Sequence, residues 1–254
     1  MKRIAVIAIM LVFCTVSIGF ACELTVRVTE QSYPPFFMKD KSGKWSGLSI
    51  ELVEALLQEA GCKATYKPLP FKRALMYLKQ GKTDMMLNLT ATEERKFFIH
   101  FIGPQLDETV ILVVRKDSNF SLAGLDDIKK LSKPVGVESG KLYGMAFEEK
   151  RATDEAFGKN IDIVNDLATN ERKLEKNHLS GFLGYGYNVF YRFKTEPLYQ
   201  NFTVHPLKIH QDWVHFGFSQ KSVSADMLQQ LQEAYDRAKQ KGVFDKIKQA
   251  YIIK

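Results

Sequence analysis

The first third of the chain alternates strand-like and helix-like patterns, and this order most constrains the fold. Apolar and polar residues alternate with a period of two in LTVRVT (24–29), which is typical of a half-buried strand. A helical spacing follows in SIELVEALLQEAG, then a strand pattern in ATYKPL, a helix pattern in residues 71–80 and a buried strand pattern in TDMMLNL. The β-α-β-α-β order predicts an α/β fold with a parallel sheet and helices on both faces.

A second set of patterns follows the first. Its strand patterns are VILVVR (110–115), PVGVESG, IDIVND, GFLGYGYN and, near the end, WVHFGF (213–218); SADMLQQLQEAYDRAKQ then has helical spacing. Two such sets predict two lobes, each a mostly parallel sheet flanked by helices. No Gly/Ser-rich linker separates the sets, so we expect crossing strands, and not a flexible tether, to join the lobes.

The N-terminus has the pattern of a signal peptide at residues 1–21. MKR is followed by the apolar stretch IAVIAIMLVFCTVSIGF, and the small residues Gly19 and Ala21 precede the expected cleavage point. The mature chain should begin near Cys22 and leave the cytoplasm for the periplasm. No later segment approaches the roughly 18 apolar residues that a membrane-spanning helix needs, so we expect the mature chain to be soluble.

Charge and motif content exclude several functions. Removing Lys2 and Arg3 leaves 34 of the 36 basic residues against 29 acidic ones, and this modest excess is scattered, which disfavours nucleic-acid binding. The five histidines are dispersed, and no His/Cys spacing suits a metal. We therefore expect no metal and no cofactor. No Ser-His-Asp order or Gly-rich phosphate loop points to an enzyme.

Two cysteines remain once Cys14 leaves with the signal peptide. Cys22 and Cys62 each precede a strand pattern, so parallel strands would place both sulfurs at the same end of the sheet. In an oxidising compartment this arrangement predicts a disulfide. The alternatives are two separate thiols, or lipidation of Cys22, for which Gly19 is a poor match to the Leu-like residue required.

The stretch NLTATEERKFF (88–98) is the first candidate binding site. Ligands of open α/β sheets bind at the carboxyl ends of strands, where Asn88 and Thr90 stand. Thr92 can cap the next helix, and Arg95 offers a fork suited to a carboxylate. Ordinary helix capping explains Thr92 equally well, but it does not explain Asn88, Thr90 and Arg95 together.

Two aromatic residues follow the ends of other strands. Tyr33 begins the rigid YPPFF turn after the first strand, and Phe71 follows the second one in LPFKRAL. Both lie at carboxyl ends, as a ligand site requires. For Phe71 the competing interpretation is a core residue, because it fits the apolar face of the helix at 71–80.

The ordered set of these segments resembles a known family. LTVRVTEQSYPPF, KSGKWSGLSIELVEALLQEAG, LPFKRALMYLKQGKTDMMLNLTATEERK, VILVVRKDS and PVGVESGKLYGMAF resemble the family 3 extracellular solute-binding proteins, the periplasmic receptors of polar amino acid ABC importers. The T-x-T-x-E-R element at 90–95 is the most specific part. The resemblance implies the two-lobe type II periplasmic binding protein fold, with two hinge strands and a cleft that closes on the ligand.

The resemblance also implies boundaries and a function. Lobe 1 would comprise residues 22–106 and 214–254, and lobe 2 residues 107–213. The chain would be a monomer that captures a small carboxylate-bearing solute, an amino acid or a related compound, for the membrane subunits of an ABC importer. The alternatives are a freestanding sensory receptor and a cyclohexadienyl-type dehydratase with Glu138 as its acid. We expect no enzymatic activity.

In lobe 1 the resemblance implies a role in ligand binding for each candidate residue. Arg95 would hold the α-carboxylate, with help from Thr90 and the backbone around Asn88. Three further residues would contact the rest of the ligand: Tyr33 and Phe71, which would sandwich its aliphatic part, and Glu30, which would read its side chain.

In lobe 2 the resemblance is less complete. Ser139 to Leu142 matches a turn that offers backbone N–H groups, although Leu142 and Tyr143 stand where a small hydroxyl residue is usual. Gly186 stands where amino acid receptors have the aspartate that neutralises the ligand ammonium. A buried ammonium without a counter-charge costs several kcal/mol. The possible substitutes are Glu30, Glu138, Asp166 and the faces of Tyr143, Tyr185 and Tyr187; otherwise the ligand has no ammonium.

Overall fold

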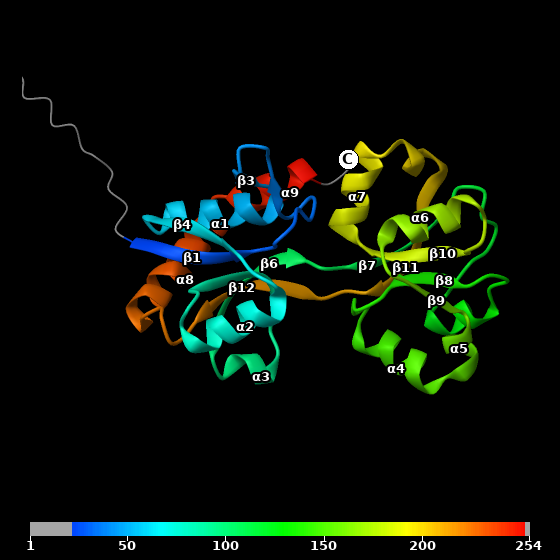
Figure 1. Cartoon of the computed structure of the whole chain (residues 1–254), viewed down its shortest axis with the longest axis horizontal. Coiled ribbons are helices and arrows are strands. Elements are labelled where there is room, and N and C mark those ends of the chain that lie inside the picture. The colour runs from blue at the N-terminus through cyan, green and yellow to red at the C-terminus, as the bar shows by residue number, and fades with distance from the viewer. Residues whose placement is uncertain (1–21, 252–254) are drawn as a thin grey trace, which may run out of the picture.

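The computed structural model describes residues 22–251, which form two α/β lobes side by side (Figure 1). The predicted signal peptide lies outside the described residues. The sheet of lobe 1 has the strand order β4 (Cys62–Pro68), β1 (Cys22–Val28), β5 (Met85–Thr90), β12 (Trp213–Ser219), β6 (Ile99–Asp107). The sheet of lobe 2 has the order β11 (Phe202–His210), β7 (Val110–Arg115), β10 (Gly181–Tyr185), β8 (Val135–Glu138), β9 (Ile161–Val164).

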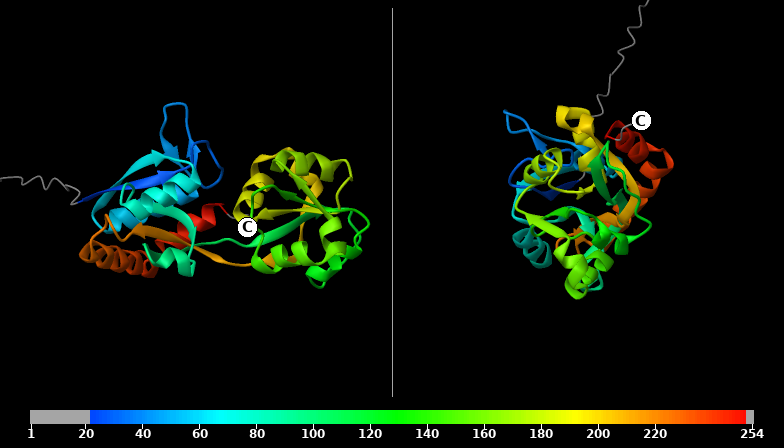
Figure 2. Two further views of the ribbon diagram at one scale, coloured as in Figure 1. Left: turned by 60° about the horizontal axis from the view of Figure 1, so that its bottom comes forward. Right: turned by 90° about the vertical axis from the view of Figure 1, so that its right-hand side faces the viewer.

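Helices cover both faces of each sheet (Figures 1 and 2). Lobe 1 has α1 (Leu48–Glu59), α2 (Phe71–Gln80), α3 (Glu93–Lys96), α8 (Ala225–Gln240) and α9 (Val243–Tyr251), with a small ribbon of β2 (Met38–Lys39) and β3 (Trp45–Ser46). Lobe 2 has α4 (Met145–Thr153), α5 (Glu155–Lys159), α6 (Leu167–Glu175), α7 (Gly186–Thr195) and the 3-10 helices η1 (Leu125–Lys130) and η2 (Pro197–Asn201). No helix within residues 22–251 has the length and apolar character needed to cross a membrane.

The predicted parallel strands are confirmed in lobe 1. β1 pairs in parallel with β4 and β5, whereas β12 runs antiparallel to β5 and β6. The parallel register places Cys22 opposite Cys62, with 4.7 Å between the Cα atoms, and the predicted disulfide joins them. This bond joins the first residues of β1 and β4, at the end of the sheet that lies away from lobe 2 (Figure 1).

A bulge in β5 sets the residues that face the cleft. Met86 pairs with Gly217 of β12 and Leu89 with His215, so β5 has one more residue than its partner between these pairs. Asn88 takes up the extra residue with a positive φ of 54°, a conformation that Asn adopts more readily than most residues. After the bulge Leu89 packs with Met86 against α2.

Two strand connections join the lobes, as predicted (Figure 1). β6 is followed almost directly by β7, and β11 by β12; between them the Glu108 N–H donates to the Asp212 carbonyl over 2.9 Å. The exact lobe boundaries remain a prediction, because β6 runs through the 106/107 boundary and β12 begins at Trp213.

Some predicted elements are shorter than expected. The strand prediction for GFLGYGYN is correct only to Tyr185, because α7 begins at Gly186. The helix after Thr92 comprises only four residues. The helix macrodipole grows with the number of aligned peptide units. So short a helix therefore stabilises a bound anion mainly through its free N–H groups and only weakly through its dipole.

Candidate functional site

Arg95 is the centre of the candidate site in lobe 1. Its Nη1 donates to the Thr90 carbonyl over 2.8 Å, and its backbone N–H donates to Thr92 Oγ1 over 3.3 Å, which confirms the predicted cap. The guanidinium is half-buried, and burial lowers the pKa of Arg95 from its ordinary value, although Glu94 opposes this. No carboxylate among residues 22–251 forms an ion pair with Arg95. Its remaining N–H donors are therefore available to an anion.

Phe71 lies beside this guanidinium and not in the core. The ring centroid is 5.7 Å from Arg95 Cζ, and 41% of the residue is exposed. The interpretation of Phe71 as a core residue is therefore wrong: it is the first residue of α2, and the buried face of that helix consists of Ala74 and Leu78. An exposed ring at the end of a strand can cover an apolar part of a ligand while it orients the arginine.

The side-chain oxygen and the backbone N–H of Asn88 already form hydrogen bonds within the protein. Its side-chain oxygen accepts from Ser49 Oγ over 2.8 Å and from Gln105 Nε2 over 2.9 Å, and its backbone N–H donates to Gln105 Oε1 over 2.9 Å. The Asn88 N–H is therefore not free for a carboxylate, and help from the rest of the backbone around Asn88 stays a prediction. The residue fixes the bulge that leads to Thr90, and only its side-chain NH₂ group remains for a ligand.

Lys141 of lobe 2 reaches across to lobe 1. Its Nζ lies 5.5 Å from the ring centroid of Tyr33 and 5.6 Å from that of Tyr185, and it is 2.6 Å from Glu138 Oε1. The ammonium thus stands between two tyrosines, one from each lobe. Tyr33 also stacks on Phe36 with 5.5 Å between ring centroids. In the sequence, Lys141 stood out only as part of a turn.

The remaining predicted residues of lobe 2 lie around this lysine. Tyr185 donates its hydroxyl to the Leu142 carbonyl over 2.8 Å. The Ser139 N–H is already bonded to the Val164 carbonyl over 2.7 Å, and Leu142 is 71% exposed, so neither is held in a preformed ligand contact. The Tyr143 ring is only 1% exposed and packs under Tyr185. The expectation of a Tyr143 face open to a cation is therefore corrected: it can act only by supporting Tyr185.

The predicted substitutes for the missing acid are placed differently from one another. Asp166 accepts from the Thr169 N–H over 2.8 Å as the cap of α6, and Glu138 pairs with Lys141. Glu30 is exposed just beyond the end of β1. Asp166 and Glu138 are therefore not free carboxylates, which corrects the expectation for these two; the role of Glu30 stays a prediction.

Glu108 is an acid near Gly186 that the sequence patterns did not reveal. It lies in the connection between the lobes, and burial together with nearby Asp212 raises its pKa to about 7, against the opposite effect of Lys141. Glu108 and Gly186 line the same small hollow as Asn88. The signal in the sequence was the acid in LDET, directly before the strand VILVVR.

Arg27 is a second missed residue. The alternation in LTVRV predicts an outward polar residue, yet Arg27 is only 8% exposed. Its Nε donates to the Leu69 carbonyl over 2.9 Å, and its Cζ lies 5.9 Å from the Phe71 centroid. Burial lowers its pKa, while Glu30 opposes this.

The main interlobe hollow has a volume of about 250 Å³, enough for a small solute. Ser32, Tyr33 and Pro34 line it from lobe 1, and the lobe 2 lining is Glu138, Lys141, Leu167, Asn188, Tyr191, Arg192 and Glu196. Asn188 Nδ2 donates to the Pro34 carbonyl over 2.6 Å, so the lobes are in contact along this side.

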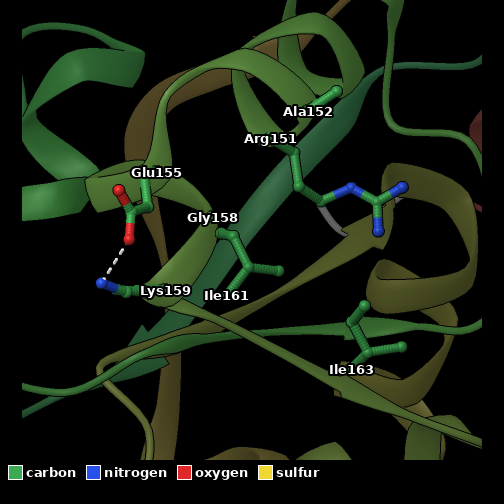
Figure 3. A pocket seen from close by; sticks show the side chains of 7 residues that line it. All are labelled: Arg151, Ala152, Glu155, Gly158, Lys159, Ile161 and Ile163. Carbon is green, nitrogen blue, oxygen red and sulfur yellow. Dashed lines mark ion pairs between the residues drawn. The ribbon is translucent and has the colours of Figure 1, made fainter.

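A larger hollow of about 590 Å³ lies within lobe 2 (Figure 3). Its polar lining is dominated by Arg151, Glu155 and Lys159, and the last two form an ion pair of 2.6 Å with both side chains largely exposed. This hollow is a solvated surface groove without the opposed walls of the interlobe site. Volume alone therefore does not identify the ligand site.

Comparison with known proteins agrees with the fold. Residues 25–254 match the family described as bacterial extracellular solute-binding proteins, family 3. The arginine-binding periplasmic protein of Mannheimia haemolytica is 26% identical over 156 residues, 58% of this chain and 62% of that protein. The L-cystine-binding protein TcyJ of Escherichia coli is 30% identical over 115 residues, 45% of this chain and 42% of that one. The matched stretches thus span only about half of these relatives' own lengths.

A solved structure extends the agreement in fold to nearly the whole chain. The unliganded, open L-cystine solute receptor of Neisseria gonorrhoeae aligns with a TM-score of 0.70 at 21% identity, covering 92% of this chain and 94% of the receptor. The two-lobe type II periplasmic binding protein fold is therefore confirmed. With the family match over all but the first part of the chain, these findings show that the chain belongs to family 3 of the bacterial extracellular solute-binding proteins.

Proposed function

We propose that this protein is a periplasmic receptor that binds a small carboxylate-bearing solute between its lobes and delivers it to the membrane subunits of an ABC importer. The single observation that carries the proposal is Arg95, which is half-buried and has no carboxylate partner within residues 22–251. A guanidinium left in this way is suited to the two oxygens of a carboxylate. The named relatives are binding proteins, which favours capture over catalysis and over sensing.

The magnitudes favour a two-walled site. A micromolar receptor needs about 8 kcal/mol, whereas one charged hydrogen bond nets about 1.5 to 3 kcal/mol. Arg95 can therefore supply only part of the affinity. Burial of the solute against Phe71 and Tyr33, and interactions with the Lys141 side of the cleft, would supply the rest. This division explains why the polar groups stand on both lobes.

No catalytic step is proposed. Glu138, the acid that a dehydratase would need, forms an ion pair of 2.6 Å with Lys141. We propose that this pair positions the lysine in the cleft. Turnover of a cyclohexadienyl substrate by the purified mature chain would contradict the proposal.

A thermal-shift and calorimetry screen tests the receptor function. The mature chain is titrated with monocarboxylates, dicarboxylates and amino acids. A true solute should give a saturable binding isotherm in calorimetry and a melting temperature that rises with the logarithm of its concentration, with about 2.7 kcal/mol of stabilisation at 100 times its Kd. Arg95→Met should raise the Kd of that solute at least tenfold. Arg73→Met, at an exposed arginine of α2, is the matched control and should leave the Kd unchanged. Unchanged binding by Arg95→Met would disprove the carboxylate anchor.

Transport requires a separate experiment in cells. Deletion of this gene should reduce uptake of the identified solute at concentrations near its Kd, and the intact gene should restore uptake. A solute that binds tightly but is taken up equally well without the protein would count against delivery to an importer.

A further inference from the structure

Arg27 is a buried charge without an ion-pair partner in the described residues, although the Glu30 carboxylate is near enough to raise its pKa against the effect of burial. Only 8% of the residue is exposed, and its one hydrogen bond within the described chain runs from Nε to the Leu69 carbonyl. No ion pair involves Arg27 anywhere in residues 22–251. Buried charges are costly unless they are paired, and removal of one partner of such a pair is strongly destabilising. Within the described residues the Nη groups of Arg27 therefore have no anionic partner, although a buried guanidinium ordinarily has one.

Arg27 and Arg95 flank the same ring. Their Cζ atoms lie 5.9 Å and 5.7 Å from the Phe71 centroid, so the two guanidiniums are at most 11.6 Å apart. Arg27 lies near the carboxyl end of β1, and Arg95 lies in α3, which follows β5. Because β1 and β5 are parallel neighbours, their carboxyl ends meet at the same edge of the sheet. Two residues beyond Arg27, the Thr29 hydroxyl is buried without a hydrogen-bond partner in the described part of the chain. Polar groups for a second anionic end are thus already in place.

The opposite wall disfavours a ligand with an ammonium. Lys141 places its own ammonium between Tyr33 and Tyr185, where the rings would otherwise be open to a cation. Gly186 offers no acid. Glu108 is the nearby carboxyl that could serve an ammonium, and it is coupled to the charge of Lys141. Glu138, another carboxylate on this wall, is already paired with Lys141 over 2.6 Å and is therefore not free for a second cation.

We propose that Arg27 and Arg95 together hold a solute with two anionic groups and no ammonium, a small dicarboxylate. This inference rests on the proposed receptor function and names its solute class. Arg95 binds one carboxylate with Thr90 nearby, Phe71 covers the carbon chain, and Arg27 binds the second carboxylate. Arg27 therefore determines specificity, because a monocarboxylate makes only the Arg95 contact.

Matched pairs of solutes separate the two anionic ends. The mature chain is titrated calorimetrically with propionate, succinate, glutarate, aspartate and glutamate. Succinate or glutarate should bind at least 100-fold tighter than propionate and at least tenfold tighter than the amino acid of equal chain length. Tighter binding of aspartate or glutamate would overturn the inference and assign the ammonium to Glu108.

Variants then identify the residue responsible. Arg27→Met should weaken binding of the dicarboxylate at least tenfold and leave the Kd of propionate unchanged, so the ratio of the propionate Kd to the dicarboxylate Kd should fall at least tenfold. If the role of Arg27 were purely structural, the variant would weaken binding of both solutes alike. Arg27→Lys, which keeps the charge, should retain part of the preference and serves if Arg27→Met fails to fold. Arg73→Met should change neither constant. An unchanged ratio in both Arg27 variants would overturn the inference.

The outcomes also distinguish this inference from the receptor function. If an amino acid binds through Arg95 with no effect of Arg27, the receptor function stands and the dicarboxylate assignment fails. If no small carboxylate raises the melting temperature at millimolar concentration, both fail.

Discussion

Replacement of Glu108 by Gln should remove a pH dependence of stability that the fold imposes. Burial and Asp212 raise the pKa of Glu108 to about 7, from about 4.5 in the unfolded chain. The folded state therefore holds the Glu108 proton more tightly than the unfolded state does. The resulting stability is fully present below pH 4.5 and is lost as the pH rises through 7. Each pKa unit corresponds to 1.36 kcal/mol, so about 2.5 kcal/mol should disappear between pH 5 and pH 8.

The test compares the native chain with Glu108→Gln by urea unfolding at pH 5, 6, 7 and 8. Gln resembles the protonated acid, so the advantage of the variant over the native chain should grow by about 2.5 kcal/mol from pH 5 to pH 8. For a chain of this size that change equals a shift in Tm of roughly 5 to 10 °C. Other groups contribute equally to both proteins, so their effect cancels in the difference between the two proteins.

Glu149→Gln is the matched control, because Glu149 is exposed and its carboxylate forms no ion pair within the described residues. Its difference from the native chain should stay constant between pH 5 and pH 8. The explanation through Glu108 would be refuted by a flat difference for Glu108→Gln, within about 0.5 kcal/mol. It would also be refuted if the variant were less stable than the native chain at pH 8.

Two further substitutions test the scaffold of each lobe. Double replacement of Cys22 and Cys62 by Ser should cost about 4 kcal/mol in urea unfolding, since the disulfide closes a loop with a sequence separation of 40; equal stability of the native chain with and without reductant would argue against that bond. Gly144→Ala should cost about 2 kcal/mol, because φ is 100° and the new Cβ would lie 2.6 Å from His210 Nδ1. Gly140→Ala, with φ of 78° and nothing within 4 Å, is the control and should cost clearly less.

The regular elements of lobe 1 could be predicted because local pattern and tertiary burial agree there. The helix predicted at residues 71–80 is α2 with the same bounds, since Ala74 and Leu78 alone set its buried face. The Cys22–Cys62 pairing followed from the strand order, because parallel neighbours place equivalent residues side by side. In the first case the deciding residues are close in sequence; in the second, 40 residues apart, the β-α-β order brings them together.

The cleft could be predicted only in part, because its contacts join distant segments. Thr90 and Arg95 are near in sequence and were predicted to serve the same carboxylate, and the structure brings them into contact. Gln105 forms hydrogen bonds with Asn88 because β12 lies between β5 and β6 and brings these two strands near each other. No local sequence pattern predicts this order of strands. Arg27 looked like an outward residue, since a period of two does not reveal that Leu69 and Phe71 lie against its side chain.

Lys141 links the chemistry of the cleft to its closure. Its ammonium contacts Tyr33 across the lobes, and Asn188 bonds the Pro34 carbonyl, yet a cation–π contact and a neutral hydrogen bond each contribute only about 1 kcal/mol. These contacts bias the lobes towards each other without holding them irreversibly. A solute decides the equilibrium only through its greater affinity for the closed form. An anion held by Arg95 that also reached Lys141 would have that preference, because the two cations stand on different lobes.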